Sequence, residues 1–344
     1  MVVDVTERCN LNCIHCRRHS PLADGSSGEP GGVDFPLDLF LALCREAKAW
    51  GVRKMILIGE GEPLLHPRLV EMVAAAKAAG CRVNLLTNGT LLNLRLAEEF
   101  IKAGLDELRV SLWASNEEEY SLLHPGVRPE MFQRALEGVR SVATAKRARK
   151  SPVPWVVVHR PIDPRFFRRI EGTLDLARQL GGDAVSFSPV KPLLPRDLET
   201  LLTHDEEQEL AGLLPRIRRK AQAAGLADNT AELLWRLNIG RAVWEKQPCY
   251  IGWIDIRIRV NGDVVPCDTC TWVMGNIHRS SIRDIWNSPA YRDFRRISRQ
   301  PLGIVQSGRH CICDYCCRAI TNARLDRLLK WWAPATAALK ENRA

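Results

Sequence analysis

The hydrophobic pattern of the first half of the chain and a little beyond alternates two kinds of segment. Short runs rich in leucine and β-branched residues predict strands over Val2–Thr6, Met55–Gly59, Arg82–Thr87, Glu107–Leu112, Val153–His159 and Ala184–Pro189. Between them, apolar residues at three- and four-residue spacing predict helices over Leu37–Ala49, Pro67–Ala79, Leu91–Ala103, Pro129–Ala143 and Arg165–Leu180. This alternation predicts βα units around a parallel sheet. Six units are too few to close an eight-stranded barrel, so we expect an α/β fold built on a partial (βα)6 barrel.

A different pattern begins near Pro192. Pro192 and Pro195 predict a linker, and residues 204–224 predict a polar helix rich in Glu and Arg. The dipeptide Asn261-Gly262 between two short apolar runs predicts a β-hairpin, because Asn-Gly favours the type I′ turn. We therefore expect a barrel core at 1–192, a helical linker region at 193–248, a small α+β domain at 249–330 and a tail at 331–344.

Composition and charge narrow the class of protein. The 344 residues are 46% hydrophobic and 26% charged, which is ordinary for a globular protein. No apolar run approaches the ~20 residues of a membrane helix, and the first residues lack the layout of a secretion signal, so we expect a cytoplasmic protein without a membrane partner. The formal charge of +9 admits nucleic-acid binding, but no aromatic residues interrupt the basic runs, which favours solvated helix faces.

Twelve cysteines are many for a cytoplasmic chain. A disulfide framework suits short secreted chains, whereas clustered cysteines in a reducing compartment more often bind metal. Most of them fall into two groups, one at Cys9, Cys13 and Cys16, the other made of Cys249, Cys267, Cys270, Cys311, Cys313 and Cys316, with Cys317 adjoining. Cys44 and Cys81 stand alone in apolar surroundings and are predicted to be buried packing residues.

The first group is a Cys-x3-Cys-x2-Cys array directly after the first predicted strand. Thiolates are ligands of iron–sulfur clusters and of zinc, but structural zinc sites usually have four protein ligands. Cys9, Cys13 and Cys16 can hold three irons of a cubane and leave the fourth iron open to a substrate. His15 would complete a zinc site only in strained geometry, because it is adjacent to Cys16.

This spacing resembles the radical S-adenosylmethionine (SAM) superfamily, whose hallmark it is. The resemblance implies that Cys9, Cys13 and Cys16 bind a [4Fe–4S] cluster whose open iron chelates SAM. In the family, SAM is cleaved reductively to methionine and a 5′-deoxyadenosyl radical, which takes a hydrogen atom from the substrate. An external one-electron donor such as flavodoxin or ferredoxin is then expected. The residue before the third cysteine lies near the adenine in this family, and His15 has that place here.

Further motifs follow the next predicted strands. The run Gly59-Glu60-Gly61-Glu62-Pro63 resembles the Gly-Gly-Glu motif of the family, and this implies that Gly59, Gly61 and Glu62 hold the ammonium group of SAM. Taken alone, the same run is a plain strand-to-helix turn. Asn88 and Ser111 close the third and fourth strands, and by the same resemblance both are expected among the cofactor-binding residues, with Ser111 the candidate for a ribose contact. Functional groups of βα barrels gather at the carboxyl ends of strands, so we expect these residues on one rim.

The second group of cysteines falls in the smaller domain. Cys249, Cys267, Cys313 and Cys316 can close a four-thiolate site for zinc or for a [4Fe–4S] cluster, and spacing alone does not separate the two. The region resembles the SPASM/twitch extension of radical SAM enzymes, which implies at least one auxiliary [4Fe–4S] cluster. The shorter twitch form is expected. Three cysteines then remain as ligands of a second cluster, as a hydrogen-donating thiol or as buried thiols: Cys270, Cys311 and Cys317.

These resemblances predict a radical SAM enzyme that dehydrogenates or epimerises a small molecule. Only eight residues precede Cys9, which leaves no room there for a peptide-recognition domain. A maturase that modifies a peptide is the alternative. A non-catalytic metal- and RNA-binding protein is a further alternative, but it does not explain motifs at successive strand ends. An electron carrier does not explain an open iron, and we find no added cobalamin domain for a methyltransferase.

Overall fold

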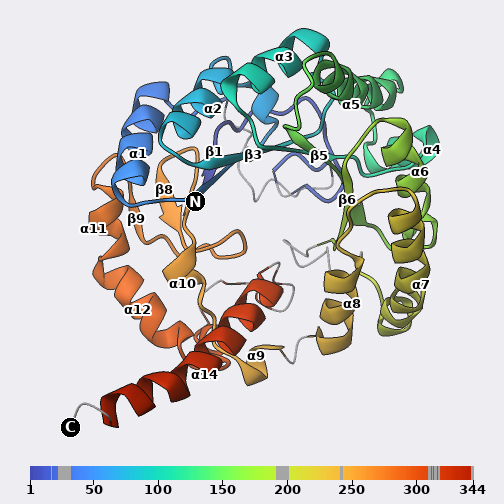
Figure 1. Ribbon diagram of the computed structural model, residues 1–344. Coiled ribbons are helices and arrows are strands. Elements are labelled where there is room, and N and C mark those ends of the chain that lie inside the picture. The colour runs from blue at the N-terminus through green and yellow to red at the C-terminus, as the bar shows by residue number, and fades with distance from the viewer. Residues whose placement is uncertain are drawn as a thin grey trace. The chain divides into compact units, whose positions relative to one another are not determined.

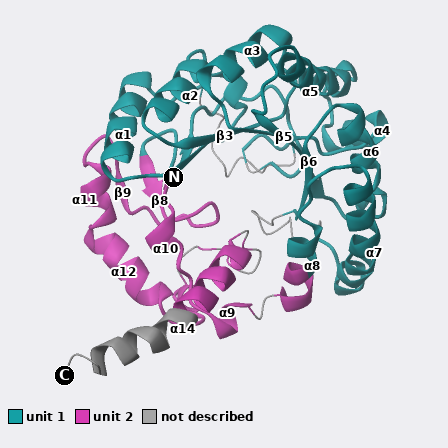
Figure 2. Ribbon diagram, in the orientation of Figure 1, with its two compact units in different colours: residues 1–234, 258–262 teal, residues 235–257, 263–344 magenta. Residues whose placement is uncertain are grey.

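The computed structural model describes residues 1–16, 18–21, 32–190, 201–240, 243–308, 311, 313, 316 and 318–341. These residues form two compact units, shown in different colours in Figure 2. Unit 1 comprises residues 1–234 and 258–262, and unit 2 comprises residues 235–257 and 263–344. The four regions expected from the sequence are a finer division, which stays a prediction. Pro192 and Pro195 lie outside the described residues.

Unit 1 is built on a parallel sheet whose strands follow chain order, each pairing with the next. The strands are β1 (Val2–Asp4), β2 (Lys54–Ile58), β3 (Arg82–Thr87), β4 (Glu107–Ser111), β5 (Trp155–Ile162) and β6 (Ala184–Pro189). The first and last of these strands are not neighbours, so the sheet is open. The expected α/β fold with a partial barrel is confirmed.

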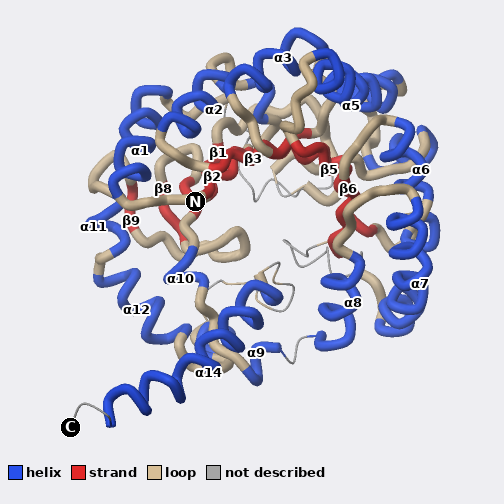
Figure 3. The backbone as a smooth tube through the Cα atoms, viewed as in Figure 1, coloured by secondary structure: helices blue, strands red, loops and turns tan. Residues whose placement is uncertain are grey.

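Helices cover the outer face of this sheet, as Figures 1 and 3 show. The helices of unit 1 are α1 (Leu37–Ala49), α2 (Leu69–Ala78), α3 (Leu94–Ala103), α4 (Glu117–Leu123), α5 (Glu130–Ala148), α6 (Gly172–Gln179) and α7 (His204–Ala223), with 3-10 turns η1 (Pro63–Leu65) and η2 (Phe167–Arg169). The sequence did not predict α4. It is short, but Asn116 caps it by accepting a hydrogen bond from the Glu119 N–H. Helix α6 begins at Gly172 and not at Arg165, because η2 and a turn take up the preceding residues.

The two faces of the sheet differ in polarity. Leu85, Leu108, Val110, Val156 and Val158 are fully buried on the helix-covered face. The alternate positions form the concave face. They are polar throughout β4, whereas Trp155, Val157 and Pro161 of β5 and Ala184 of β6 add apolar surface beside the polar residues His159, Ser186 and Ser188. There the register places Ser111 beside His159 and His159 beside Ser186, so these side chains share one face. The inside of the partial barrel therefore carries hydrogen-bonding groups on rigid strands.

Unit 2 is a small α+β assembly of short elements. They are α9 (Val243–Lys246), α10 (Ile251–Ile254), β8 (Asp263–Val265), β9 (Gly275–Asn276), α11 (Ile282–Trp286), α12 (Pro289–Ser298), α13 (Gly303–Gln306) and α14 (Ala319–Glu341), while α8 (Thr230–Ile239) and β7 (Arg257–Ile258) each contain a unit boundary. Strands β8 and β9 pair antiparallel. The Gly262 N–H donates to the Arg259 carbonyl oxygen at 2.9 Å, and Gly262 has φ +83° while Asn261 does not have a positive φ. The chain therefore turns here as expected, but the predicted type I′ turn is wrong, because that turn needs positive φ at both residues. No helix in the described part of the chain is long and apolar enough to cross a membrane.

Candidate functional site

The first three cysteines lie on the loop that leaves the carboxyl end of β1, and all three are partly buried. The Cys16 N–H donates to the Cys13 carbonyl oxygen at 2.9 Å, which closes a tight turn between these two cysteines. Burial is the main cause that raises the pKa of Cys9 to about 11 and the pKa of Cys13 well above its usual range. The thiols also lie close enough to raise one another's pKa. Buried thiolates gathered in this way need a positive partner such as a metal centre.

The glycine-rich turn after β2 packs directly against the start of the cysteine loop. The Gly61 N–H donates to the Thr6 carbonyl oxygen at 3.1 Å, and the Glu62 N–H donates to the Arg8 carbonyl oxygen at 2.7 Å. A Cβ atom on Gly61 would fall 2.0 Å from that Arg8 oxygen, and one on Gly59 would fall 2.6 Å from the Gly61 oxygen. Both glycines are therefore required by close backbone approach, and the turn places Glu62 beside the cysteine loop.

Glu62 is 2% exposed and sits between the ends of β2 and β3. Its carboxyl accepts hydrogen bonds from the Thr87 hydroxyl at 2.5 Å, from the Asn88 N–H at 2.6 Å and from the Leu64 N–H at 3.0 Å. Burial raises the pKa of Glu62 to about 7 in spite of these donors. A buried carboxylate of this kind is stabilised by a cation, and the ammonium group of SAM is of the right charge.

Asn88 ties the end of β3 to the cysteine loop. Its side-chain amide donates to the Asn10 Oδ1 at 2.9 Å, and the Asn10 amide donates to the Thr90 hydroxyl at 2.8 Å. Ser111 is the last residue of β4 and lies on the concave face, beside His159 in the register. The carboxyl ends of β1 to β4 thus bring the predicted residues to one rim, while the role of each residue stays a prediction.

His15 connects the cysteine loop with the end of β5, which the sequence did not predict. Its Nε2 lies 2.8 Å from Asp163 Oδ2, and its ring stacks on Trp113 with centroids 5.4 Å apart. Burial opposes ionisation of Asp163, but hydrogen bonds from Arg165 and His15 lower the pKa of that carboxyl well below its usual range. Asp163 follows β5 directly. It escaped notice because the sequence suggested that this strand ends at His159, whereas it continues to Ile162.

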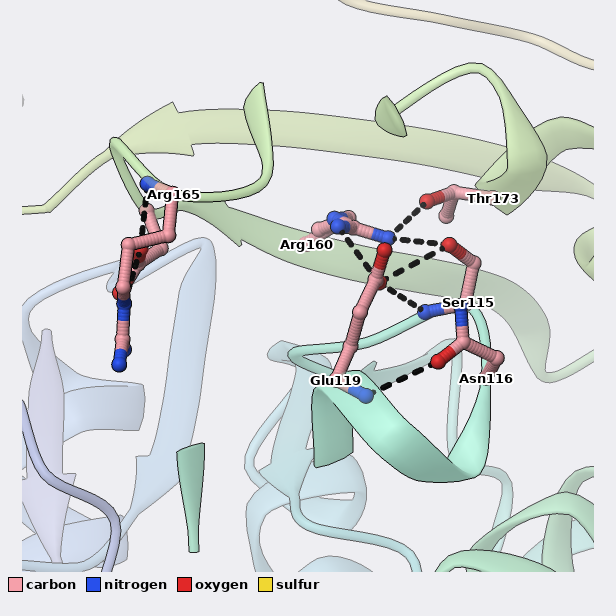
Figure 4. A network of polar contacts seen from close by, with 7 residues as sticks. Ser115, Asn116, Glu119, Arg160, Arg165 and Thr173 are labelled. Atoms are coloured by element: carbon pink, nitrogen blue, oxygen red, sulfur yellow. Dashed lines mark hydrogen bonds and ion pairs between the residues drawn. The ribbon is translucent and has the colours of Figure 1, made fainter. Parts of the chain in front are cut away.

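A second buried polar network holds the ends of β4 and β5 together (Figure 4). The Arg160 guanidinium, 1% exposed, donates to Glu119 Oε2 at 2.9 Å and to the Ser115 hydroxyl at 2.6 Å. It also reaches the Thr173 hydroxyl at 3.3 Å. Since Glu119 is fully buried, loss of either charge would leave the other unpaired in the interior. The network therefore fixes the rim that carries Trp113 and Asp163.

The second group of cysteines lines one cavity inside unit 2. Cys249, Cys267, Cys313 and Cys316 all face it. Burial, with a smaller contribution from the nearby Cys267, raises the pKa of Cys249 to about 12. Four thiols around one cavity are the donor set of a fully ligated iron–sulfur cluster, and the chemistry of the site fits an auxiliary cluster.

The sequence left the roles of the remaining cysteines open. In this structure Cys270 and Cys311 are paired as a disulfide. Their pairing was missed because 41 residues separate them and an isolated antiparallel bridge brings them together. Cys44 and Cys81 are buried as predicted. Cys317 lies outside the described residues.

Two family models match this chain. The radical SAM superfamily matches residues 3–158, and the SPASM iron–sulfur cluster-binding domain matches residues 249–318. The chain therefore belongs to the radical SAM superfamily and carries a C-terminal SPASM domain, as the sequence predicted. These domains imply a SAM-binding [4Fe–4S] cluster, SAM itself and auxiliary iron–sulfur chemistry.

Relatives extend over most of the chain. The AdoMet-dependent heme synthase of Methanosarcina barkeri is 28% identical over 334 residues, covering 91% of this chain and 87% of the relative. The tungsten-containing aldehyde ferredoxin oxidoreductase cofactor-modifying protein of Pyrococcus furiosus is 26% identical over 88% of this chain and 84% of its own length. The PqqA peptide cyclase of Gluconobacter oxydans is also 26% identical, over 88% of this chain and 80% of its own length.

Solved structures share the fold. The structure titled native anSMEcpe with bound AdoMet has a TM-score of 0.69 at 13% identity and covers 99% of both chains. Streptococcus suis SuiB bound to S-adenosylmethionine has a TM-score of 0.65 at 17% identity, over 86% of this chain and 67% of its own. SuiB has also been solved with its precursor peptide SuiA. The radical SAM members among these relatives are enzymes, and this chain is one as well.

Proposed function

We propose that this enzyme removes a hydrogen atom from a small polar molecule and thereby dehydrogenates or epimerises it. The observation that carries this proposal is the polar concave face of the sheet, which lies inside the partial barrel and leads to the rim with the cysteine loop. When bound, the cluster and SAM supply a 5′-deoxyadenosyl radical that accepts the hydrogen atom.

The concave face holds its polar groups in fixed positions. The His159 Nδ1 lies 2.7 Å from the Ser186 hydroxyl, and its Nε2 lies 3.2 Å from the Ser188 hydroxyl. Arg109 extends the row, with its guanidinium 3.1 Å from Glu107 Oε1 and 3.5 Å from the Ser186 hydroxyl. Groups that are held on strands and hydrogen-bonded to one another are suited to orient hydroxyl or carboxyl groups of a compact substrate.

The residues of the rim would bind the cluster and SAM. Cys9, Cys13 and Cys16 would hold the cluster, and Glu62 would hold the ammonium group of SAM with the carbonyl groups of Gly59 and Gly61. His15, backed by Asp163, would fix the adenine side, Ser111 would meet the ribose, and Asn88 would keep the cysteine loop in place.

The net reaction depends on the second unit. Dehydrogenation needs an acceptor for one electron after the hydrogen atom has left, and a cluster on Cys249, Cys267, Cys313 and Cys316 would provide it. Epimerisation needs a hydrogen atom returned to the other face of the carbon. An external one-electron donor such as flavodoxin or ferredoxin would reduce the first cluster.

Modification of a peptide is the second candidate function. The relative named as a PqqA peptide cyclase supports it, because that relative matches most of this chain. The compact polar row inside the barrel favours the small substrate.

The proposal is tested on anaerobically reconstituted protein that is reduced with dithionite and given SAM. We expect 5′-deoxyadenosine to form slowly without a substrate and faster with the true one, and deuterium from the substrate to enter 5′-deoxyadenosine. Libraries of polar metabolites and of peptides, assayed side by side, separate the two candidates. Acceleration by peptides alone would refute the small-molecule assignment.

A further inference from the structure

Helix α4 lies against the cysteine loop. The Ile14 N–H donates to the Leu123 carbonyl oxygen at 3.0 Å, and the Asn12 amide donates to the Pro125 carbonyl oxygen at 2.6 Å. Tyr120 stands one turn before the end of this helix and is 3% exposed. Its ring stacks on His124, with centroids 4.0 Å apart, so the side chain has one firmly held orientation.

The hydroxyl of Tyr120 is buried and has no hydrogen-bond partner among the described residues. Buried hydroxyl groups without a partner are rare, and each one calls for an explanation. Burial is the main cause that raises the pKa of Tyr120, and the negative charges of Cys13, Cys9 and Glu62 add to it. A phenol is protonated at neutral pH, so this buried hydroxyl is a donor that lacks an acceptor among the described residues.

Helix α4 and the turn after it are hydrogen-bonded to the cysteine loop on both sides of Cys13, through the Ile14 N–H and the Asn12 amide. The carboxyl oxygens of Glu62 already accept hydrogen bonds from three donors, so the sulfur atoms of the loop are the acceptors still open. We propose that Tyr120 is a positioning residue that donates its O–H to a sulfur atom of the cluster on Cys9, Cys13 and Cys16. This inference rests on the cluster placement in the proposed function.

A hydrogen bond to a cluster sulfur has a definite consequence. The reduced cluster is more negative than the oxidised one, so a donor at the sulfur stabilises the reduced form and raises the reduction potential. Tyr120 would thus make it easier for the external donor to deliver the electron. His124 supports this role through the stacked rings and not through the cluster itself.

The test compares reconstituted wild-type protein with Tyr120→Phe, which removes one oxygen atom from a buried site. We expect unchanged iron content, about a five-fold lower ratio of reduced to oxidised first cluster at a fixed potential, and loss of one exchangeable deuteron coupling in D2O. The coupling is read by electron–nuclear double resonance on the signal that responds to SAM. The matched control is Tyr291→Phe, since Tyr291 is a fully buried tyrosine of unit 2 whose hydroxyl likewise has no partner within the described part of the chain. It should leave the first cluster unchanged.

A second variant covers the case in which Tyr120→Phe does not assemble a cluster. Replacing Tyr120 with 3-fluorotyrosine keeps the shape and strengthens the donor, so the same ratio should rise. An unchanged ratio and an unchanged deuteron coupling would overturn the inference. Neither readout requires turnover, and the wild-type 5′-deoxyadenosine assay reports separately on the proposed function.

Discussion

The imidazole of His15 and the carboxylate of Asp163 form a buried pair, with His15 Nε2 2.8 Å from Asp163 Oδ2 and side chains that are only 4% and 3% exposed. The pair joins the loop of the cluster cysteines to the strand on the far side of the rim. Because one face of the imidazole is also stacked on Trp113, the ring has little freedom.

We expect this pair to act as one unit in SAM binding. His15→Ala and Asp163→Ala should each weaken SAM binding by roughly ten-fold or more, since a buried hydrogen bond to a charged group is worth roughly 1.5–3 kcal/mol. The double variant should bind about as weakly as either single one. Equilibrium binding to protein of matched iron content measures this. Asp175→Ala, on an exposed residue of α6, is the control, and additive losses would show that the two residues act independently.

The pH dependence of SAM binding should follow Glu62. Its pKa of about 7 lies above the ordinary value, so burial favours the neutral form, and the free energy of unfolding falls as the pH rises through 7. The ammonium group of SAM needs the charged form. Binding should therefore weaken below pH 7, by up to about ten-fold per pH unit. Glu62→Gln should bind weakly at every pH, and a pH profile that persists in this variant would assign the effect to another group.

Gly61 should tolerate no side chain. A Cβ atom there would meet the Arg8 carbonyl oxygen at 2.0 Å, so the turn or the cysteine loop must move. Gly61→Ala should lower the free energy of unfolding by about 2 kcal/mol or more and reduce the iron bound at the first site. Gly212 lies inside α7 with nothing within 4 Å of its Cβ position. Gly212→Ala should instead stabilise the protein by about 0.5–1 kcal/mol. Thermal unfolding measures the stability of both variants. If the two substitutions changed the free energy of unfolding equally, the close backbone approach at Gly61 would be unimportant.

The auxiliary site should be separable from SAM cleavage. Cys313→Ala and Cys316→Ala remove thiols that line the cavity of unit 2 and leave the cysteine loop of unit 1 intact. We expect these variants to lose about four irons per chain and still form 5′-deoxyadenosine, while turnover of the true substrate stops. Full substrate turnover would mean that the auxiliary cluster takes no part in the reaction.

The strand pattern predicted the barrel because buried parallel strands are short apolar runs that repeat between amphipathic helices. The rim residues could be predicted for the same reason, because Gly61, Glu62 and Asn88 directly follow strands. The order of the motifs along the chain indicated the radical SAM superfamily, which the cysteine spacing alone did not establish.

Contacts between residues far apart in the sequence could not be predicted from it. The approach of His15 to Asp163 spans 148 residues, and no local pattern encodes it. Helix α4 was missed because its sequence is short and acidic, and Tyr120 with it. The pairing of Cys270 with Cys311 depends on how the loops of unit 2 fold back on one another. Twelve cysteines in one sequence allow many pairings, so the sequence alone could not predict this one.

The central claim is that Cys9, Cys13 and Cys16 hold a cubane with one open iron. Mössbauer spectroscopy of protein reconstituted with 57Fe, recorded with and without SAM, tests it most directly. We predict that SAM changes the signal of one iron of a [4Fe–4S] cluster, and that this cluster is missing from the triple Cys→Ala variant but present in Cys44→Ala. A SAM-insensitive cluster, or zinc bound by these three thiols, would contradict the account.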